Sequence, residues 1–126
     1  MAKDDYDKLV CVILTYLYAR IKGKTDIKPE DYLQPMTKDF PVIEDYFNFI
    51  LESMIKAGYI EGPTFTRTWS GEIISADGIS DIRITADGIH YLCENSIMRK
   101  MLEWLRDNAV TLLPGMSSTI LSILSR

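Results

Sequence analysis

Several features are scarce in this chain of 126 residues, and each scarcity excludes a class of protein. The chain has 7 glycines and 5 prolines against 47% hydrophobic residues, which excludes collagen-like, low-complexity and intrinsically disordered chains. No apolar run approaches the roughly 20 residues that a transmembrane helix needs, so we expect no membrane span. The first residues lack the charged, apolar and small-residue layout of a secretion signal, and we therefore expect a cytoplasmic protein.

Histidine and cysteine are also rare. The only histidine is His90, and the two cysteines, Cys11 and Cys93, lie far apart in the sequence. A structural zinc site takes four ligands in closely spaced pairs, so no bound metal is expected. His90 and Cys93 are three residues apart on one predicted helix, but Cys93 falls on its apolar side and no third orienting group is recognisable. No glycine-rich phosphate loop is present, so we expect no enzyme activity and no cofactor.

Basic charge is also scarce, and it lies at the two ends of the chain. The formal net charge is −4, and residues 29–62 alone carry −5, because two lysines face seven carboxylates. Residues 1–28 and residues 96–126 each carry +2. Phosphate neutralisation supplies most nonspecific affinity for nucleic acid, so a DNA-binding protein is expected to show a basic face. The middle of this chain is acidic instead.

Three helices are expected in the first half of the chain. Apolar residues recur at intervals of three and four over residues 6–21, which predicts an amphipathic helix. Pro29 is suited to the first turn of a short second helix. A third helix is expected to begin near Asp39 as its N-cap, to carry Pro41 in its first turn and to end at Gly58.

The middle of the chain is expected to form two or three antiparallel strands. Short apolar or β-branched runs alternate there with turn-forming pairs, a pattern that is typical of hairpins. The turn-forming pairs are Ser70-Gly71 and Asp77-Gly78. The predicted extended pieces are residues 59–60, 64–70, 73–74 and 79–84.

The last third of the chain is expected to be helical again. Thr85 is the predicted N-cap of a fourth helix over residues 86–95, and a fifth helix begins near Ser96. Pro114 and Gly115 are expected to close this fifth helix.

The predicted elements follow the order of a known architecture. Three helices followed by a β-hairpin are typical of the winged helix-turn-helix, whose third helix is offered to the major groove of DNA. We therefore expect an α+β fold, mainly α: a winged helix-turn-helix with a short β-hairpin or three-stranded wing and extra C-terminal helices. Residues 1–112 are expected to form a single domain that includes its C-terminal helix. Residues 113–126 form a short amphipathic tail that either folds back on the core or meets a partner.

Three stretches of the sequence resemble a known family. They are Ile-Lys-Ala-Gly-Tyr-Ile at residues 55–60, Ile-Thr-Ala-Asp-Gly-Ile-His-Tyr-Leu at 84–92 and Glu-Asn-Ser-Ile-Met at 94–98. With these stretches the chain is similar to the YjcQ-like proteins, small winged-helix proteins of Gram-positive bacteria and their phages. The resemblance covers roughly residues 5–110. It implies a winged-helix fold, a link to phages or prophages and, by analogy, a DNA-binding or regulatory role.

The first functional hypothesis is a regulator that binds double-stranded DNA as a homodimer. Asparagine pairs with adenine, lysine and arginine contact phosphates, and an aromatic ring stacks on bases or enters a groove. Acidic residues on the same third helix oppose this hypothesis, because they repel the DNA backbone. The candidate DNA contacts are Lys38, Asn48, Lys56, Arg67 and Trp69.

The second hypothesis is a protein-interaction module, an adaptor or oligomerisation domain that does not bind DNA. An acidic third helix suits a basic site on another protein. The apolar side of the tail suits a partner or a homodimer contact. The candidate residues are Glu44, Asp45 and Glu52 in the helix and Ile120, Leu121 and Leu124 in the tail. The sequence leaves both hypotheses open.

Overall fold

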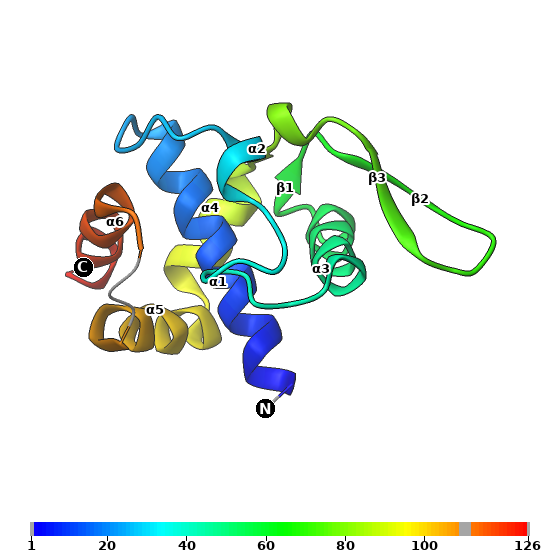
Figure 1. Ribbon diagram of the computed structural model, residues 1–126. Helices are drawn as coiled ribbons and strands as arrows, with labels where there is room; N and C mark the ends of the chain where they lie inside the picture. The colour runs from blue at the N-terminus through cyan, green and yellow to red at the C-terminus, as the bar shows by residue number, and fades with distance from the viewer. Residues whose placement is uncertain (1, 109–111, 126) are drawn as a thin grey trace.

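The computed structural model describes residues 2–108 and 112–125 and confirms an α+β chain that is mainly helical (Figure 1). In the described residues, no helix is both long enough and apolar enough to cross a bilayer. The helices are α1 (Ala2–Ile21), α2 (Pro29–Tyr32), α3 (Glu44–Lys56), the short 3₁₀-helix η1 (Ile79–Asp81), α4 (Ala86–Glu94), α5 (Ser96–Asn108) and α6 (Pro114–Leu124). The strands are β1 (Ile60–Glu61), β2 (Thr64–Arg67), β3 (Ile73–Asp77) and β4 (Arg83–Ile84).

Helix α1 runs through the centre of the molecule (Figure 1). Every side chain from Leu9 to Leu17 is buried, because α3, α4, α5, α6 and β4 pack around this helix. Burial therefore extends beyond the predicted apolar stripe and includes the polar Thr15. Ile21, at the end of that stripe, is an exception and is 58% exposed.

The start of α3 differs from the prediction. The helix begins at Glu44 with Ile43 as its N-cap residue, so the predicted start at Asp39 is wrong. The carboxylate of Asp39 instead accepts a hydrogen bond of 2.6 Å from the Tyr32 hydroxyl, which ties the loop to α2. Pro41 consequently lies in the loop before α3 and not in its first turn.

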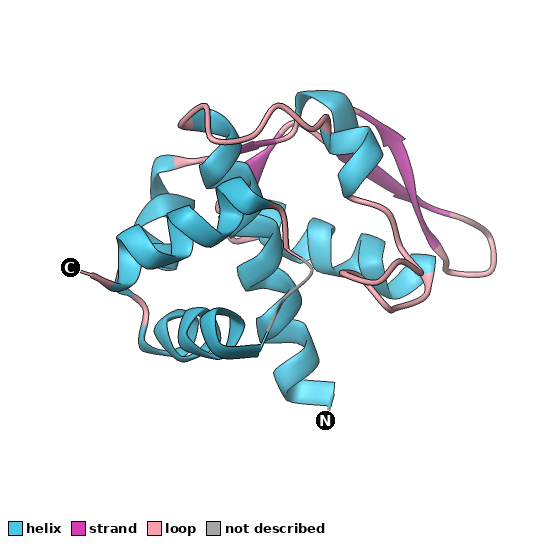
Figure 2. Ribbon diagram, turned by 60° about the vertical axis from the view of Figure 1, so that its left-hand side comes forward, coloured by secondary structure: helices cyan, strands magenta, loops and turns pink. Residues whose placement is uncertain are grey.

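The strands form two separate antiparallel sheets of two strands each. One sheet pairs β1 with β4 and lies close to the helices. The other pairs β2 with β3 as a hairpin that projects from the body of the molecule (Figures 1 and 2). The registers place Ile60 opposite Ile84 in the first sheet and Arg67 opposite Ile73 in the second.

Two further predicted boundaries are wrong. Residues 79–81 form the helix η1, so the extended piece predicted over residues 79–84 reduces to the short strand β4. Gly78, with a left-handed φ of 89°, turns the chain into η1. Pro114 begins α6 and does not close α5, because its fixed φ and missing N–H suit a first helical turn.

Helix α6 is part of the hydrophobic core. It packs on α1 and α5, and Met116, Thr119, Ile120 and Ile123 are buried there. Of the two outcomes that the sequence leaves open for this segment, the structure shows that it folds back on the core. The residue pattern alone could not choose between them, because an apolar helix face packs equally well on its own domain or on a partner.

Candidate functional site

Helix α3 is bound to the hairpin by two of its polar side chains. The Nδ2 amide of Asn48 donates a hydrogen bond of 2.9 Å to the carbonyl of Ile73 in β3. The backbone N–H of Ile73 donates one of 2.7 Å to Oδ1 of Asp45. We call this pair of bonds the Ile73 clamp. It satisfies both backbone groups of Ile73. Among the described residues, β3 has no second strand beside it on this edge.

Glu52 extends this contact along the helix. Its Oε1 lies 3.2 Å from Arg67 Nη2 on β2 and 3.9 Å from Lys56 Nζ in the last turn of α3. Both cations are exposed, so each ion pair contributes only about 0–1 kcal/mol. Asp45, Asn48 and Glu52 are spaced by three and four residues, so all three lie on one face of α3. That face is turned toward the hairpin of the same chain.

This arrangement brings some predicted DNA contacts together and separates others. Lys56 and Arg67 meet at the carboxylate of Glu52, as described above. Asn48 is only 5% exposed, so it cannot reach a base while the hairpin is in place. Lys38 lies away from the hairpin, beside Lys8 of α1 and Trp104 of α5 at a cavity of about 290 Å³. Sequence reasoning treated the polar face of α3 as free, and it missed Ile73 as the residue that covers this face.

Trp69 lies in the turn at the end of the hairpin. Its side chain is fully exposed, which is unusual for the largest apolar side chain. The turn that carries it is closed by hydrogen bonds: the Gly71 N–H donates to the Thr68 carbonyl over 3.0 Å, and the Glu72 N–H donates to Thr68 Oγ1 over 3.1 Å. The indole is therefore displayed by a defined turn at a protruding point.

The predicted protein contacts are also divided. Glu44 is exposed in the first turn of α3, whereas Asp45 and Glu52 already bind the hairpin. In α6, Ile120 is buried in the core and Leu124 is partly buried against it. Leu121 is 55% exposed and faces outward.

Cys11 and His90 lie in different environments. Burial raises the pKa of the Cys11 thiol to about 12, although its contact with Thr15 acts in the opposite direction. This thiol is therefore protonated at neutral pH and is a poor nucleophile. His90 is exposed and contacts Glu94 at 3.2 Å, one helical turn away. Among the described residues, no group of three or more histidine, cysteine, aspartate or glutamate side chains is arranged to hold a metal ion.

Comparison with known proteins places the chain in a family. A family model described as YjcQ protein matches residues 12–108, from the middle of α1 to the end of α5. The chain belongs to the YjcQ family. The resemblance found in the sequence is thereby confirmed, and the YjcQ match includes α3 and the hairpin but not α6. Searches of curated proteins and of solved structures each return no match.

Proposed function

We propose that this YjcQ-family chain is a non-catalytic winged-helix protein that binds another protein through its hairpin. The order of α1, α2, α3 and the β2–β3 hairpin supports the winged-helix assignment, in which α3 occupies the position of the recognition helix. In the DNA-binding members of that architecture, the recognition helix places polar side chains against base edges. In this chain, the corresponding polar side chains of α3 bind the hairpin instead, and the protein-binding proposal rests on that difference.

The observation that carries the proposal is the Ile73 clamp. Asp45 and Asn48 use their hydrogen-bonding groups on the hairpin, so the polar face of α3 is not offered to a groove. To admit DNA, the hairpin would have to leave α3, which breaks two hydrogen bonds and exposes the buried Asn48. Each bond is worth about 0.5–1.5 kcal/mol net, and a buried group left unpaired costs about 1–3 kcal/mol.

Charge and exposure favour a protein partner over DNA. The exposed acidic residues of α3 and the hairpin include Glu44, Glu72 and Asp77, whereas Arg67 is already paired with Glu52. Such a surface repels phosphates and is attracted to basic surfaces on proteins. Trp69 supplies an aromatic anchor, the residue type most enriched among the side chains that dominate protein interfaces.

The first test measures binding to DNA. We expect no binding of the purified chain to random-sequence duplex DNA in fluorescence anisotropy, even at about 50 mM salt, where phosphate contacts are strongest. A binding constant that falls steeply with salt and is weakened by Lys56→Ala and Arg67→Ala would overturn the proposal in favour of the DNA-binding regulator.

The second test concerns the partner. The chain is immobilised and exposed to an extract of cells that carry its gene, and the captured polypeptides are identified by mass spectrometry. We expect one polypeptide to be retained by the wild type and lost, at least tenfold, with Trp69→Ala. Trp104→Ala is the matched control, because Trp104 is also exposed, at 43%, but lies on α5. Equal retention by the two variants would show that the hairpin tip is not the binding element.

A further inference from the structure

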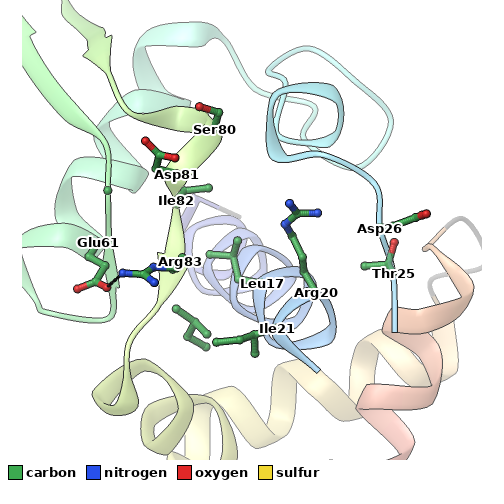
Figure 3. Close-up of a pocket in the computed structure, with 12 residues that line it drawn as sticks. Leu17, Arg20, Ile21, Thr25, Asp26, Glu61, Ser80, Asp81, Ile82 and Arg83 are labelled. Carbon is green, nitrogen blue, oxygen red and sulfur yellow. Dashed lines mark hydrogen bonds and ion pairs between the residues drawn. The ribbon is translucent and has the colours of Figure 1, made fainter. Parts of the chain in front are cut away.

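A groove of about 910 Å³ lies between β4 and the segment that joins α1 to α2 (Figure 3). Its volume is within the range of peptide and ligand sites. No described residue of the hairpin lines it, so it is a surface distinct from the one proposed above. The last turns of α1 form the floor with Leu17 and Ile21, β4 forms one wall with Arg83 and Ile84, and Thr25 and Asp26 form the opposite wall.

Strand β4 borders this groove with an edge that pairs with no other described strand, and Ile84 on it is 5% exposed. In the β1–β4 ladder Ile60 lies opposite Ile84, and one position further along the Thr85 N–H donates a hydrogen bond of 3.0 Å to the Tyr59 carbonyl. Hydrogen-bonded and non-hydrogen-bonded pairs alternate in an antiparallel ladder, so Ile60 and Ile84 form a non-hydrogen-bonded pair. The N–H and C=O of Ile84 therefore point away from β1. Neither group bonds to any other residue that the structure describes.

The opposite wall is held away from β4 by contacts of its own. The Ile27 carbonyl accepts hydrogen bonds from the Tyr16 hydroxyl and from Arg20 Nη1, the latter at 3.2 Å. Gly115 of α6 lies so close to Lys24 that an added Cβ would be 2.2 Å from the Lys24 carbonyl oxygen. These contacts fix the segment on α1 and α6, so it does not pair with β4. No described strand therefore occupies the place next to β4 on the side of the groove.

We propose that the groove binds an extended peptide segment of a partner protein, which adds a strand to the open edge of β4. The backbone groups of Ile84 supply the hydrogen bonds that an added strand needs. Ile21, 58% exposed on the floor beside Leu17, supplies an apolar surface for every second side chain of the peptide.

The charges at the rim of the groove indicate which side chains the peptide should carry at the positions that point away from the floor. Arg83 is paired with Glu61 at 2.9 Å, and Arg20 is bound to the Ile27 carbonyl. Asp26 and Asp81 line the same groove. Arg20 keeps its positive charge in its bond to the neutral carbonyl, so the charged residues of the rim sum to −1 and leave it weakly acidic. A basic residue at the outward positions complements this rim. The occupant is thus an extended segment in which apolar and basic residues alternate.

The test uses a designed probe, the acetylated and amidated hexapeptide Lys-Val-Lys-Val-Lys-Val. Its binding is followed by NMR in the ¹⁵N-labelled full chain. We expect shifts at the amides of the groove and at least tenfold slower hydrogen exchange of the Ile84 amide at saturating peptide. Two further peptides are N-methylated at the valines or at the lysines. Strand addition uses the donors on one edge of the peptide, so at least one of these two peptides must lose binding.

Protein variants separate the groove from nonspecific adhesion. Ile21→Asn is expected to weaken binding at least tenfold, whereas Leu121→Asn leaves it unchanged. The two residues are matched, because both are exposed leucine or isoleucine side chains on helices, at 58% and 55%. Urea unfolding of both variants verifies that they fold.

Three results would overturn the proposal. The first is an Ile84 amide that does not respond to the peptide, and the second is equal binding of all three peptides. The third is an Ile84 amide that is already protected in the free chain and loses protection on dilution, because a second copy of the chain then occupies the groove. None of these results bears on Trp69, so this proposal and the function proposed for the hairpin fail independently.

Discussion

At the scale of single residues, burial decides whether a reactive side chain is available for chemistry. Cys11 is fully buried in α1, and its thiol has a pKa of about 12 against an ordinary value of 9.0. The folded-state pKa is raised, so the stability that the neutral thiol contributes is complete below pH 9 and is lost as the pH rises toward 12.

This pKa shift leads to a prediction for the pH dependence of stability. Between pH 8 and pH 11, the wild type is expected to lose more free energy of unfolding than Cys11→Ala, because the unfolded chain ionises this thiol and the folded chain does not. Urea denaturation of both proteins at the two pH values measures the difference. Equal losses would mean that Cys11 ionises as easily in the folded state as in the unfolded one.

Gly88 shows a second kind of constraint on one residue. Glycine is unfavourable inside a helix by about 1 kcal/mol relative to alanine, yet Gly88 lies in the first turn of α4. An added Cβ would lie 2.2 Å from the Tyr59 carbonyl oxygen and 2.8 Å from Cγ1 of Ile84. The glycine therefore allows α4 to approach the β1–β4 sheet closely.

We predict that Gly88→Ala destabilises the protein in spite of its better helix propensity. The cost of displacing the neighbouring backbone is about 1–3 kcal/mol. The free energy of unfolding from urea denaturation is the measurement, with Asp87→Ala at the exposed neighbouring position as the control. A variant as stable as the wild type would show that α4 can move away at no cost.

At the scale of elements, the contact between α3 and the hairpin joins residues that are 25 positions apart in the sequence. The Ile73 clamp anchors β3 at the end next to the turn, and Arg67 of β2 meets Glu52 of α3 beside it, whereas the turn that carries Trp69 projects into solvent. Removing one partner leaves the other buried and unpaired, which costs more than the bond itself is worth.

Asn48→Ala is accordingly expected to lower the free energy of unfolding by about 1–3 kcal/mol, because the Ile73 carbonyl loses its donor. Hydrogen exchange of the hairpin amides should be faster than in the wild type. Exchange of the α1 and α5 amides should change only as much as the global free energy of unfolding predicts. Glu44→Ala is the control, since Glu44 is exposed on the same helix and the clamp is made by Asp45 and Asn48. Hairpin exchange that does not change would show that Asn48 does not hold the strand.

At the scale of the whole molecule, the packing of α6 shows that this C-terminal helix is part of the hydrophobic core. Three of its apolar side chains, Met116, Ile120 and Ile123, are buried against α1 and α5. Deleting residues 115–126 would therefore expose the core. A loss of dimerisation after this deletion could then result from unfolding as well as from a lost dimer contact. Point substitutions on the two faces of α6 are more informative.

Ile120→Ala is expected to cost about 2–5 kcal/mol, the range for truncation of a buried aliphatic side chain. Leu121→Ala at the adjacent exposed position is expected to change stability by less than about 0.5 kcal/mol. Urea denaturation measures both variants, and sedimentation shows whether either substitution changes the association state. Similar costs for the two would mean that α6 does not pack on α1 by the face described.

Several local features of this fold were predictable from short stretches of sequence. Pro29 begins α2, Thr85 caps α4 by accepting a hydrogen bond of 3.0 Å from the Gly88 N–H, and Gly58 ends α3 with a φ of 83°. Each of these features depends on the conformation of a few neighbouring residues, which the sequence specifies directly. The hairpin between residues 64 and 77 was predictable for the same reason.

Two of the wrong predictions depend on which neighbours a residue meets in the folded chain. Asp39 has the residue type of an N-cap, but the hydroxyl of Tyr32 takes its carboxylate. Pro114 has a sequence context that ends helices or begins them, and the packing of α6 on α1 decides for the beginning. A residue type restricts the roles that a position can take, and the tertiary neighbours choose among them.

The sequence alone determined the mainly helical α+β class, the hairpin, the order of the elements and the YjcQ membership, because these follow from local propensity and from residues close together in the chain. Only the tertiary structure decided that Asn48 faces Ile73 and not solvent, that Ile120 belongs to the core, and that β4 keeps an open edge beside a groove. The physical reason is the same in all three cases. A periodic pattern shows that a helix face or strand edge exists, but burial and hydrogen-bond pairing depend on which distant segment arrives there.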